Sequence, residues 1–350
     1  MNNIDQNKNS VLPIEFIALV QDALPVQAEI LLESIQHDPP SLSIRLHPHK
    51  GADLHFTDHP VSWCPLGQYL QDRPVFTLDP LFQAGAYYVQ EASSMVLCHV
   101  LSQLQLPESP AVLDLCAAPG GKSTLLLDFL NGKGHLVANE VIKSRAAVLV
   151  DNLVKWGYAN CCITNNDPKD FTQLENHFDL ILVDAPCSGE GMFRKDHNAI
   201  AEWSIDNVAL CAGRQQRIID DVLPALKEGG YLIYSTCTFN QQENISNVAE
   251  YVEKYKLRSV EIALPAAWNM VEISANNCKG YQCMPGFTRG EGYFFSVLQK
   301  PMGNNVPDFQ QSKAHKLRTI NKAEKSILDL WINPDYLTDV QIHENGDVYY

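Results

Sequence analysis

From residue 111 onward, short runs of consecutive apolar residues alternate with longer segments in which apolar residues recur at helical spacing. Continuous apolar runs are typical of strands buried on both faces, as in a parallel sheet covered by helices. The pattern therefore predicts an α/β fold with a doubly wound, mostly parallel sheet. The expected strands are 111–116, 135–140, 161–167, 178–187 and 229–237, and the expected helices are one that ends near 130, then 142–156, 205–226 and 241–254. Residues 292–300 predict a late strand at an antiparallel edge of the sheet.

The N-terminal part of the chain has a different pattern. Helical spacing over 13–24 and 26–36 is followed by alternation over 42–46, which predicts a strand. We expect a small α/β domain over residues 1–95 and a sheet domain over 96–300, joined by a helix that runs from about 93 to 104.

The last segment, 301–350, differs again. It holds a cluster of cationic residues and ends in ENGDVYY, which predicts a hairpin turn entering a strand. We expect a basic linker and the start of a C-terminal domain that continues beyond residue 350. The cationic residues are Lys313, Lys316, Arg318, Lys322 and Lys325.

Composition narrows the class of protein. The formal net charge is −15, which argues against a protein that coats nucleic acid through its overall charge, although local basic surfaces remain compatible with it. No apolar run is long enough to span a bilayer, and the opening residues 1–10 lack the build of a secretory signal. The 10 cysteines are scattered without zinc-type spacing. We therefore expect a cytoplasmic protein with free thiols, no metal site and no membrane partner.

The segment DLCAAPGGKS, from Asp114 to Ser123, follows the first expected strand of the sheet. Ligands of open parallel sheets bind beyond the carboxyl ends of the strands, and Gly120 and Gly121 allow the backbone to approach a ligand closely. A Walker A loop would need glycine where Cys116 stands, and a GxGxxG fingerprint is absent. A loop that binds a methyl donor and an ordinary tight turn remain as alternatives.

Acidic residues close the next three expected strands. Glu140 lies 20 residues after Gly120, a spacing at which a carboxylate accepts both ribose hydroxyls of a nucleoside. Asp167 is placed to accept an adenine amino group, and Asp184 closes the fourth strand. Each acid taken alone also suits a helix N-cap or a loop. Together, three carboxylates at successive strand ends favour a cationic sulfonium ligand over a pyrophosphate.

Two cysteines lie at the ends of the fourth and fifth expected strands. Cys187 ends Asp-Ala-Pro-Cys and Cys237 ends Ser-Thr-Cys, so both thiols are expected in one pocket. The alternative is that both are buried structural cysteines. A thiolate that adds to carbon 6 of cytosine makes carbon 5 nucleophilic, and Asp184 is placed to stabilise the adduct near ring nitrogen 3. Such a pocket requires the base to be single-stranded or flipped out. Strand position alone does not rank the two thiols.

At these residues the chain resembles the Sun-type RNA (cytosine-5) methyltransferases, and within them the bacterial ribosomal small-subunit RNA (cytosine-5) methyltransferase F group. The resemblance extends from about residue 79 to 298, and LPIEFI and SIRLHPHK extend it towards the N-terminus. The matching stretches are DPLFQAGAYYVQEASSM, DLCAAPGGKS, VDAPCSGEGMFRKD, RQQRIIDDVLPALKEGGYLIYSTCTF with QQEN, and GEGYFF.

The resemblance implies a Rossmann-like methyltransferase sheet, S-adenosylmethionine as the cofactor and RNA, by family the 16S ribosomal RNA, as the partner. It implies that Cys237 is the nucleophile, that Cys187 assists product release, and that Glu140, Asp167 and Asp184 contact the donor or the base. The donor loop would be formed by Cys116, Ala117, Ala118, Pro119, Gly120, Gly121 and Lys122. The resemblance also implies an RNA-contacting N-terminal domain and an RNA-binding C-terminal domain, of which only the start is expected here.

Three other functions are compatible with parts of this pattern. A transfer RNA cytosine-5 methyltransferase would share every motif. A DNA cytosine-5 methyltransferase would use Cys187 as the nucleophile and would need a large target-recognition insert, which the sequence does not contain. A non-catalytic RNA-binding assembly factor would not require the thiols and acids at the strand ends. We expect the RNA methyltransferase to act as a monomer.

Overall fold

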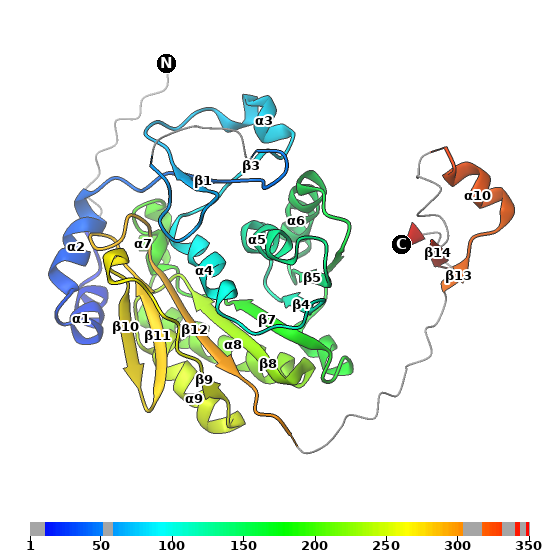
Figure 1. Cartoon of the computed structure of the whole chain (residues 1–350). Coiled ribbons are helices and arrows are strands. Elements are labelled where there is room, and N and C mark those ends of the chain that lie inside the picture. Colours follow the sequence, from blue (N-terminus) through cyan, green and yellow to red (C-terminus); the bar gives the residue numbers. More distant parts are fainter. Residues whose placement is uncertain (1–10, 52–58, 304–316, 331–339, 344–347, 350) are drawn as a thin grey trace. The chain divides into compact units, whose positions relative to one another are not determined.

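The computed structural model describes residues 11–51, 59–303, 317–330, 340–343, 348 and 349, and within them nine strands form the largest sheet. Five of the strands are parallel, in the order β6-β5-β4-β7-β8 (Figure 1). The chain passes from β4 outward to β5 and β6, and then returns to place β7 on the other side of β4. Ligands of α/β sheets bind at such a reversal. The five strands are β4 (Ala111–Asp114), β5 (His135–Asn139), β6 (Cys161–Thr164), β7 (Phe178–Asp184) and β8 (Leu226–Thr236).

The prediction of a doubly wound, mostly parallel sheet with a small N-terminal α/β part is confirmed, whereas the expected edge strand is placed differently. Strand β12 (Tyr293–Gln299) pairs antiparallel with β8, but β11 (Cys278–Cys283) and β10 (Val271–Ala275) follow it outward, so β12 lies inside the sheet. The short β9 (Arg258–Ser259) also pairs with β12. The β10–β11 hairpin was not predicted, although its turn residues Asn276 and Asn277 have φ of 48° and 64°, a conformation that asparagine tolerates.

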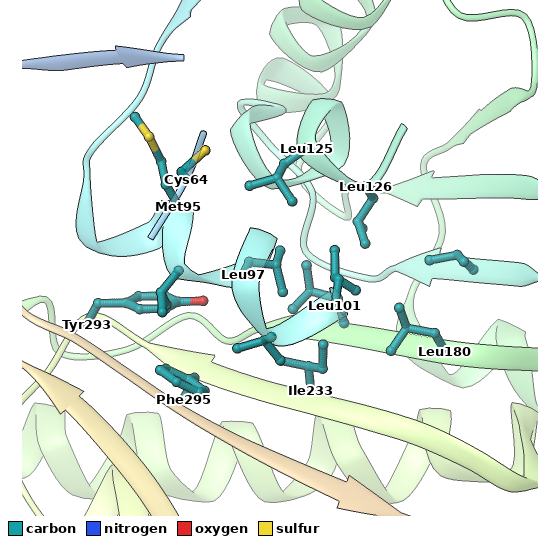
Figure 2. Close-up of a cluster of buried hydrophobic side chains, with 14 of the residues drawn as sticks. Cys64, Met95, Leu97, Leu101, Leu125, Leu126, Leu180, Ile233, Tyr293 and Phe295 are labelled. Carbon is teal, nitrogen blue, oxygen red and sulfur yellow. The ribbon is translucent and has the colours of Figure 1, made fainter. Parts of the chain in front are cut away.

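Helices cover both faces of the sheet (Figure 1). On one face lie α4 (Leu97–Ser102), α5 (Gly121–Leu130) and α6 (Lys143–Trp156), and on the other α8 (Ile205–Val222) and α9 (Asn247–Tyr255). Successive strand residues point to opposite faces, so Leu180 and Leu182 join one buried cluster while Ile181 and Val183 join the other. Figure 2 shows the first cluster, in which Leu97 and Leu101 of α4 and Leu125 and Leu126 of α5 lie on the same face of the sheet as Leu180 and Ile233.

Three expected helices have irregular ends. The helix expected from 93 to 104 is a 3-10 turn (Ser93–Val96) followed by α4. The helix expected over 205–226 ends at Val222, and a 3-10 turn over Leu223–Ala225 leads directly into β8. The helix expected over 241–254 begins with a π-helical turn over Gln242–Ser246, which leads into α9.

The N-terminal segment packs onto the sheet domain at two places. Helices α1 (Ile14–Ala23) and α2 (Ala28–His37) contribute to a buried cluster with residues around α7 (His197–Glu202), in which the rings of Phe16 and Phe193 lie 4.9 Å apart. The three strands of its own sheet, in the order β2-β1-β3, are β1 (Ser43–Leu46), β2 (Gly67–Tyr69) and β3 (Tyr87–Val89), and α3 (Pro80–Gln83) precedes β3.

A buried arginine makes the second connection. Arg45 on β1 is 1% exposed and forms an ion pair with Asp128 on α5. Its Nη2 donates to Thr124 Oγ1 at 2.5 Å, its Nε donates to Gln90 Oε1 at 2.8 Å, and its guanidinium lies 4.8 Å from the centre of the Trp156 ring. A buried charge with partners on both segments fixes the N-terminal sheet against α5 and α6.

The chain divides into two compact units, Met1–Gly303 and Asn304–Tyr350. The expected boundary near residue 95 falls inside the first unit and stays a prediction. In the second unit, β13 (Leu317–Thr319), β14 (Gln341–His343) and β15 (Val348–Tyr349) form a small antiparallel sheet, and α10 (Lys322–Leu328) follows its N-cap Asn321.

Two expectations for this end of the chain involve residues outside the described part. They are the cations Lys313 and Lys316 and the hairpin turn at 344–347. Arg318, which is described, pairs with Glu324 of α10. Among the described helices, none has the length and apolar character needed to cross a membrane.

Candidate active site

A cavity of about 750 Å³ opens at the carboxyl ends of β4, β7 and β8. One wall is the loop after β4, and another is the N-terminal segment around β1 and β3. Eight residues that the sequence analysis singled out line this cavity: Cys116, Ala117, Ala118, Pro119, Gly121, Lys122, Asp184 and Cys237. The topological reversal and the candidate motifs thus meet at one place in the fold.

The loop after β4 is held by side chains of α6. Arg145 Nη2 donates to the carbonyl of Ala118 at 2.8 Å, and Asn152 Nδ2 donates to the carbonyl of Pro119 at 2.8 Å. Gly120 has φ of 115°, in the left-handed region that favours glycine, and it caps the N-terminus of α5. The loop is therefore fixed in shape beside the cavity that it lines.

Lys122 and Asp184 form an ion pair at the cavity wall. Lys122 Nζ lies 2.7 Å from Asp184 Oδ2, while Ser235 Oγ donates to Asp184 Oδ1 at 2.8 Å. Burial opposes the charge on Lys122, but the neighbouring Asp184 carboxylate outweighs it and raises the pKa of the lysine. The Asp184 side chain keeps 32% of its surface exposed, so it is held in place and still open to a ligand.

The two cysteines lie side by side at the bottom of the site. Cys187 Sγ is 3.1 Å from Cys237 Sγ, and the backbone N–H of Cys237 donates to Cys187 Sγ at 3.3 Å. The hydrogen bond with Cys237, together with burial, raises the pKa of Cys187 well above its ordinary value. Cys237 lines the cavity, whereas Cys187 is not among the lining residues.

Two buried carboxylates hold the loops that carry these cysteines. Glu190, which follows Cys187, accepts hydrogen bonds from the backbone N–H of Phe239 at 2.7 Å and of Asn240 at 3.1 Å, and from the Thr238 hydroxyl. Its side chain also accepts from the indole N–H of Trp203 at 3.0 Å. The loop after β7 is thereby tied directly to the loop after β8.

The second carboxylate is Glu243, at the start of the π-helical turn. It accepts from the backbone N–H of Ser188 at 3.0 Å, from Gln215 Nε2 at 2.8 Å and from Asn240 Nδ2 at 2.8 Å. Burial raises the pKa of Glu243, while the hydrogen bonds from Ser188 and Asn240 oppose that shift. Neither glutamate was predicted from the sequence, although each lies within six residues of a candidate cysteine.

Glu140 follows β5 directly, as predicted, but it is not among the residues that line the cavity. Its side chain is 2% exposed, and Oε1 accepts from the backbone N–H of Ile142 at 2.9 Å. Its Oε2 lies 3.4 Å from Arg145 Nη1 and accepts no hydrogen bond from the described residues. A buried carboxylate oxygen with unused acceptor capacity suits a ligand hydroxyl.

Asp167 is a helix N-cap, which was the alternative to a ligand contact for this residue. It lies three residues beyond the end of β6 and caps the 3-10 helix Pro168–Gln173, with Oδ1 accepting from the backbone N–H of Lys169 at 3.2 Å. Arg217 Nη2 is 3.9 Å from Oδ2. Asp167 does not line the cavity, and neither does Gly120.

Asp114, the last residue of β4, is a further buried carboxylate at this edge. Burial raises its pKa to about 7, although the hydrogen bond from Ser123 Oγ at 2.6 Å to Oδ2 works in the opposite direction. Within the described residues its Oδ1 has no hydrogen-bond partner. Asp114 opens the segment DLCAAPGGKS, but no role was predicted for it from the sequence.

A family model described as 16S rRNA methyltransferase RsmB/F matches residues 101–299. The chain belongs to this RsmB/F family. A second model, described as the N-terminal domain of 16S rRNA methyltransferase RsmF, matches residues 12–92. The resemblance found in the sequence is confirmed, and with it an S-adenosylmethionine-dependent RNA methyltransferase as the enzyme class.

Curated relatives agree with the RsmB/F assignment. The ribosomal RNA small subunit methyltransferase F of Vibrio vulnificus is 31% identical over 94% of this chain and 74% of its own length. The protein of the same name from Shewanella piezotolerans is 32% identical over 98% of this chain and 74% of its own length.

Solved structures share the fold. A methyltransferase homologue from Pyrococcus horikoshii superposes with a TM-score of 0.70 at 26% identity, covering 83% of this chain and 96% of that one. NSun6 from Pyrococcus horikoshii, solved with SFG, gives a TM-score of 0.69 at 19% identity and covers 83% of this chain and 99% of that one.

The residues of this RsmB/F member fit S-adenosylmethionine. The open Oε2 of Glu140 suits a ribose hydroxyl, and the loop from Cys116 to Lys122 lets the backbone approach the ligand beside the carboxylate of Asp184. Carboxylates at the strand ends complement the positive charge of a sulfonium. Arg145, which contacts both Glu140 and the loop carbonyl of Ala118, couples the two parts of this site and was not predicted.

Proposed function

We propose that this protein transfers a methyl group from S-adenosylmethionine to carbon 5 of a cytosine in 16S ribosomal RNA, through a covalent bond between Cys237 Sγ and carbon 6 of the base. One observation carries the proposal. Cys237 lines the cavity together with Asp184 and the donor loop, while a second thiol, that of Cys187, lies 3.1 Å from its sulfur.

The chemistry explains why a thiol is needed. Carbon 5 of cytosine is a weak nucleophile, and S-adenosylmethionine supplies an electrophilic methyl group that only an activated carbon accepts. When Cys237 Sγ forms a bond to carbon 6, the ring double bond gives its electron pair to carbon 5, which becomes enamine-like. Carbon 5 then takes the methyl group, and the donor leaves as the neutral thioether. A base removes the proton from carbon 5, its electron pair re-forms the double bond between carbons 5 and 6, and Cys237 Sγ leaves as a thiolate.

Asp184 is proposed to stabilise the adduct at ring nitrogen 3. Its carboxyl group is fixed by Lys122 and Ser235 at distances of 2.7 and 2.8 Å and remains partly exposed to the cavity. A group held in place before the reaction stabilises developing charge without reorganisation at the moment of transfer.

Cys187 is proposed to assist the release of the product. Its raised pKa keeps the thiol protonated, so its S–H is available to donate to Cys237 Sγ at 3.1 Å. That hydrogen bond stabilises the thiolate that leaves when the bond to carbon 6 breaks. The arrangement supports different roles for the two cysteines, since only Cys237 lines the cavity.

Glu140→Ala is expected to weaken the binding of S-adenosylmethionine by roughly 1–3 kcal/mol, because ligand hydroxyls would lose a buried acceptor. Calorimetric titration with the donor measures the change. Glu253→Ala, which removes an exposed glutamate from α9, serves as the matched control and should bind the donor normally. Equal affinities of the two variants would place the ribose of the donor at another residue.

The substrate is tested by mapping 5-methylcytosine in total RNA from cells with and without this protein. The proposal predicts that a modified cytosine disappears from the small-subunit ribosomal RNA when the protein is removed. Loss of a modification from transfer RNA alone, with the ribosomal pattern unchanged, would contradict the assigned substrate.

We further propose that the enzyme acts as a monomer in the cytoplasm. The donor loop, Asp184 and Cys237 line one cavity within a single chain, and the relatives named above carry the name ribosomal RNA small subunit methyltransferase F. Sedimentation analysis of the purified protein tests the monomer directly.

A further inference from the structure

A second cavity, of about 520 Å³, adjoins the catalytic cavity. Five residues line both cavities, so the two share one wall: Pro40, Ser41, Leu42, Gln71 and Arg194. The remaining walls of the second cavity are the segments 38–39 and 286–290 together with Leu70. This cavity contains neither a donor-loop residue nor a candidate cysteine.

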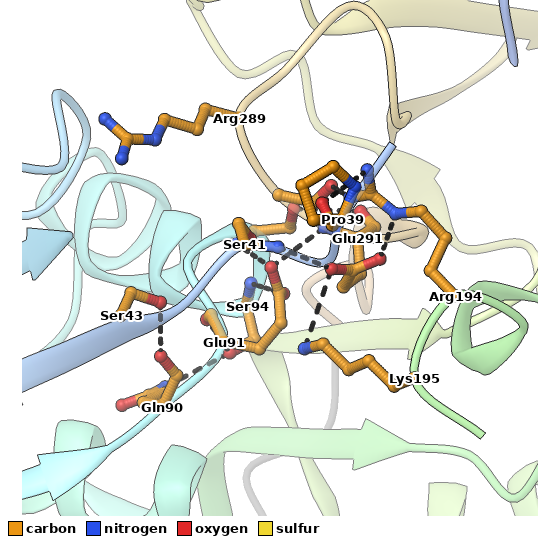
Figure 3. A network of polar contacts seen from close by, with 12 residues as sticks. Pro39, Ser41, Ser43, Gln90, Glu91, Ser94, Arg194, Lys195, Arg289 and Glu291 are labelled. Atoms are coloured by element: carbon orange, nitrogen blue, oxygen red, sulfur yellow. Dashed lines mark hydrogen bonds and ion pairs between the residues drawn. The ribbon is translucent and has the colours of Figure 1, made fainter. Parts of the chain in front are cut away.

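The wall between the cavities is a fixed polar network (Figure 3). Arg194 Nε lies 2.8 Å from Glu291 Oε2, and its Nη2 donates to the carbonyl of Gly290 at 2.6 Å. The backbone N–H of Ser41 donates to Glu291 Oε1 at 3.2 Å, and Lys195 Nζ lies 3.8 Å from the same oxygen. Glu91, which lines the catalytic cavity, accepts from the backbone N–H of Glu291 at 2.9 Å, so two cations and two carboxylates balance in this network. An anion in the second cavity therefore needs a further cation.

Arg289 is the exposed cation of the second cavity. Figure 3 shows its guanidinium directed away from the Glu291 network, and within the described part of the chain no ion pair involves it. The guanidinium lies 4.2 Å from the centre of the Tyr69 ring, whose hydroxyl donates to the Arg289 carbonyl at 2.6 Å. The acidic residue in the cavity wall, Asp38, accepts a hydrogen bond from Ser34 Oγ at 2.5 Å. Tyr69 thus holds Arg289 in place, and the guanidinium can form an ion pair with an anion in the second cavity.

The lining of the second cavity matches single-stranded RNA. It combines a guanidinium, the half-buried aromatic ring of Phe287, the Gln71 amide and backbone from a glycine-containing loop. Recognition of unstacked RNA relies on such combinations of arginine, aromatic rings and polar groups. A target cytosine that enters the catalytic cavity leaves its neighbouring nucleotide near the entrance, because consecutive nucleotides are covalently joined.

We propose that the second cavity binds the nucleotide next to the target cytosine, and that Arg289 binds the phosphate that joins the two. This inference rests on the proposed function, since it requires a cytosine in the catalytic cavity. It adds to that function a binding site for the flanking nucleotide, the second cavity, and a residue for its phosphate, Arg289.

The first test compares Arg289→Gln with Arg258→Gln on a small-subunit RNA fragment that contains the cytosine mapped for the wild-type enzyme. Arg258 is exposed on β9 and pairs with the end of β12 that is opposite to the active site, so its substitution makes the same change of charge elsewhere. Arg289→Gln should raise KM for RNA by roughly five- to tenfold. It should also reduce the slope of log affinity for RNA against log salt concentration by about the amount that one phosphate contact contributes.

Donor affinity, measured by calorimetry, shows whether Arg289→Gln still folds. It should equal that of the wild type, and Arg289→Lys should recover part of the RNA affinity because it keeps the charge. Equal KM values for Arg289→Gln and Arg258→Gln would overturn the inference.

The second test neutralises one phosphate of the RNA. Two fragments carry a methylphosphonate linkage on the 5′ or the 3′ side of the target cytosine. For the wild-type enzyme one of the two should raise KM, and Arg289→Gln should show no further rise with that fragment, since both changes remove one contact. Additive losses with both fragments would overturn the assignment of Arg289 to this phosphate. Absence of RNA methylation by the wild-type enzyme would instead contradict the proposed function itself.

Discussion

Cys237→Ala is expected to lower methyl transfer to RNA by more than about 10³-fold, equivalent to about 4 kcal/mol of barrier, because carbon 5 of the base can no longer be activated. Donor binding should stay near the wild-type value, since the loop from Cys116 to Lys122 and Glu140 are unchanged. Methyl incorporation from labelled S-adenosylmethionine and calorimetry measure the two quantities.

The matched control for this change is Cys162→Ala, which removes an exposed thiol from β6. It should methylate RNA at the wild-type rate. A Cys237→Ala enzyme that turned over like this control would show that the nucleophile lies elsewhere.

Cys187→Ala is expected to trap a covalent complex between protein and RNA. The substitution removes the S–H that lies 3.1 Å from Cys237 Sγ, so the departing thiolate loses its hydrogen bond and its release slows by about 10²-fold or more. The first methyl transfer should still occur, whereas multiple turnovers should not. Denaturing electrophoresis of the protein with labelled RNA detects the complex.

The double variant Cys187→Ala with Cys237→Ala controls for this result, because it lacks the sulfur that forms the bond. It should give no retained RNA. Rapid multiple turnover by the single Cys187→Ala variant, without a slow-migrating species, would contradict the release role.

The sheet could be predicted because parallel strands are buried on both faces, and this burial requires apolar residues at consecutive positions. The sequence also predicted that Cys187 and Cys237 meet, because adjacent parallel strands end at the same edge. It could not rank the two thiols. Which sulfur faces the cavity depends on the path of the irregular segment between β7 and Cys187, and the spacing of the residues does not predict that path.

The part of the catalytic cavity wall that the N-terminal segment forms was not predicted. Ser41 to Ser43 and Tyr88 to Glu91 come from the N-terminal segment, and they reach the cavity only because Arg45 and its buried partners dock β1 against α5. No local spacing encodes such a long-range contact. Arginine is usually exposed, whereas Arg45 is buried and paired with Asp128.

The carboxylates illustrate a different limit. Glu140 and Asp167 were given the same kind of role from their positions at strand ends. In the structure, Oε2 of Glu140 accepts no hydrogen bond from the described residues. Oδ1 of Asp167, by contrast, accepts a hydrogen bond from the backbone of the 3-10 helix that it caps. Which side chain satisfies the backbone and which stays open to a ligand depends on turn geometry. Glu190 and Glu243 were missed because buried acids that hold loops together carry no spacing signal of their own.

The central claim is that Cys237 bonds to the target base, and peptide mapping of a trapped complex tests it most directly. The wild-type enzyme is incubated with S-adenosylmethionine and an RNA fragment that carries 5-fluorocytidine at the mapped position. Because fluorine replaces the proton that must leave carbon 5, the bond between sulfur and carbon 6 should persist. Mass spectrometry should then find the modified nucleotide on the peptide that contains Cys237. Attachment to the peptide that contains Cys187, or the absence of any covalent complex, would contradict the account.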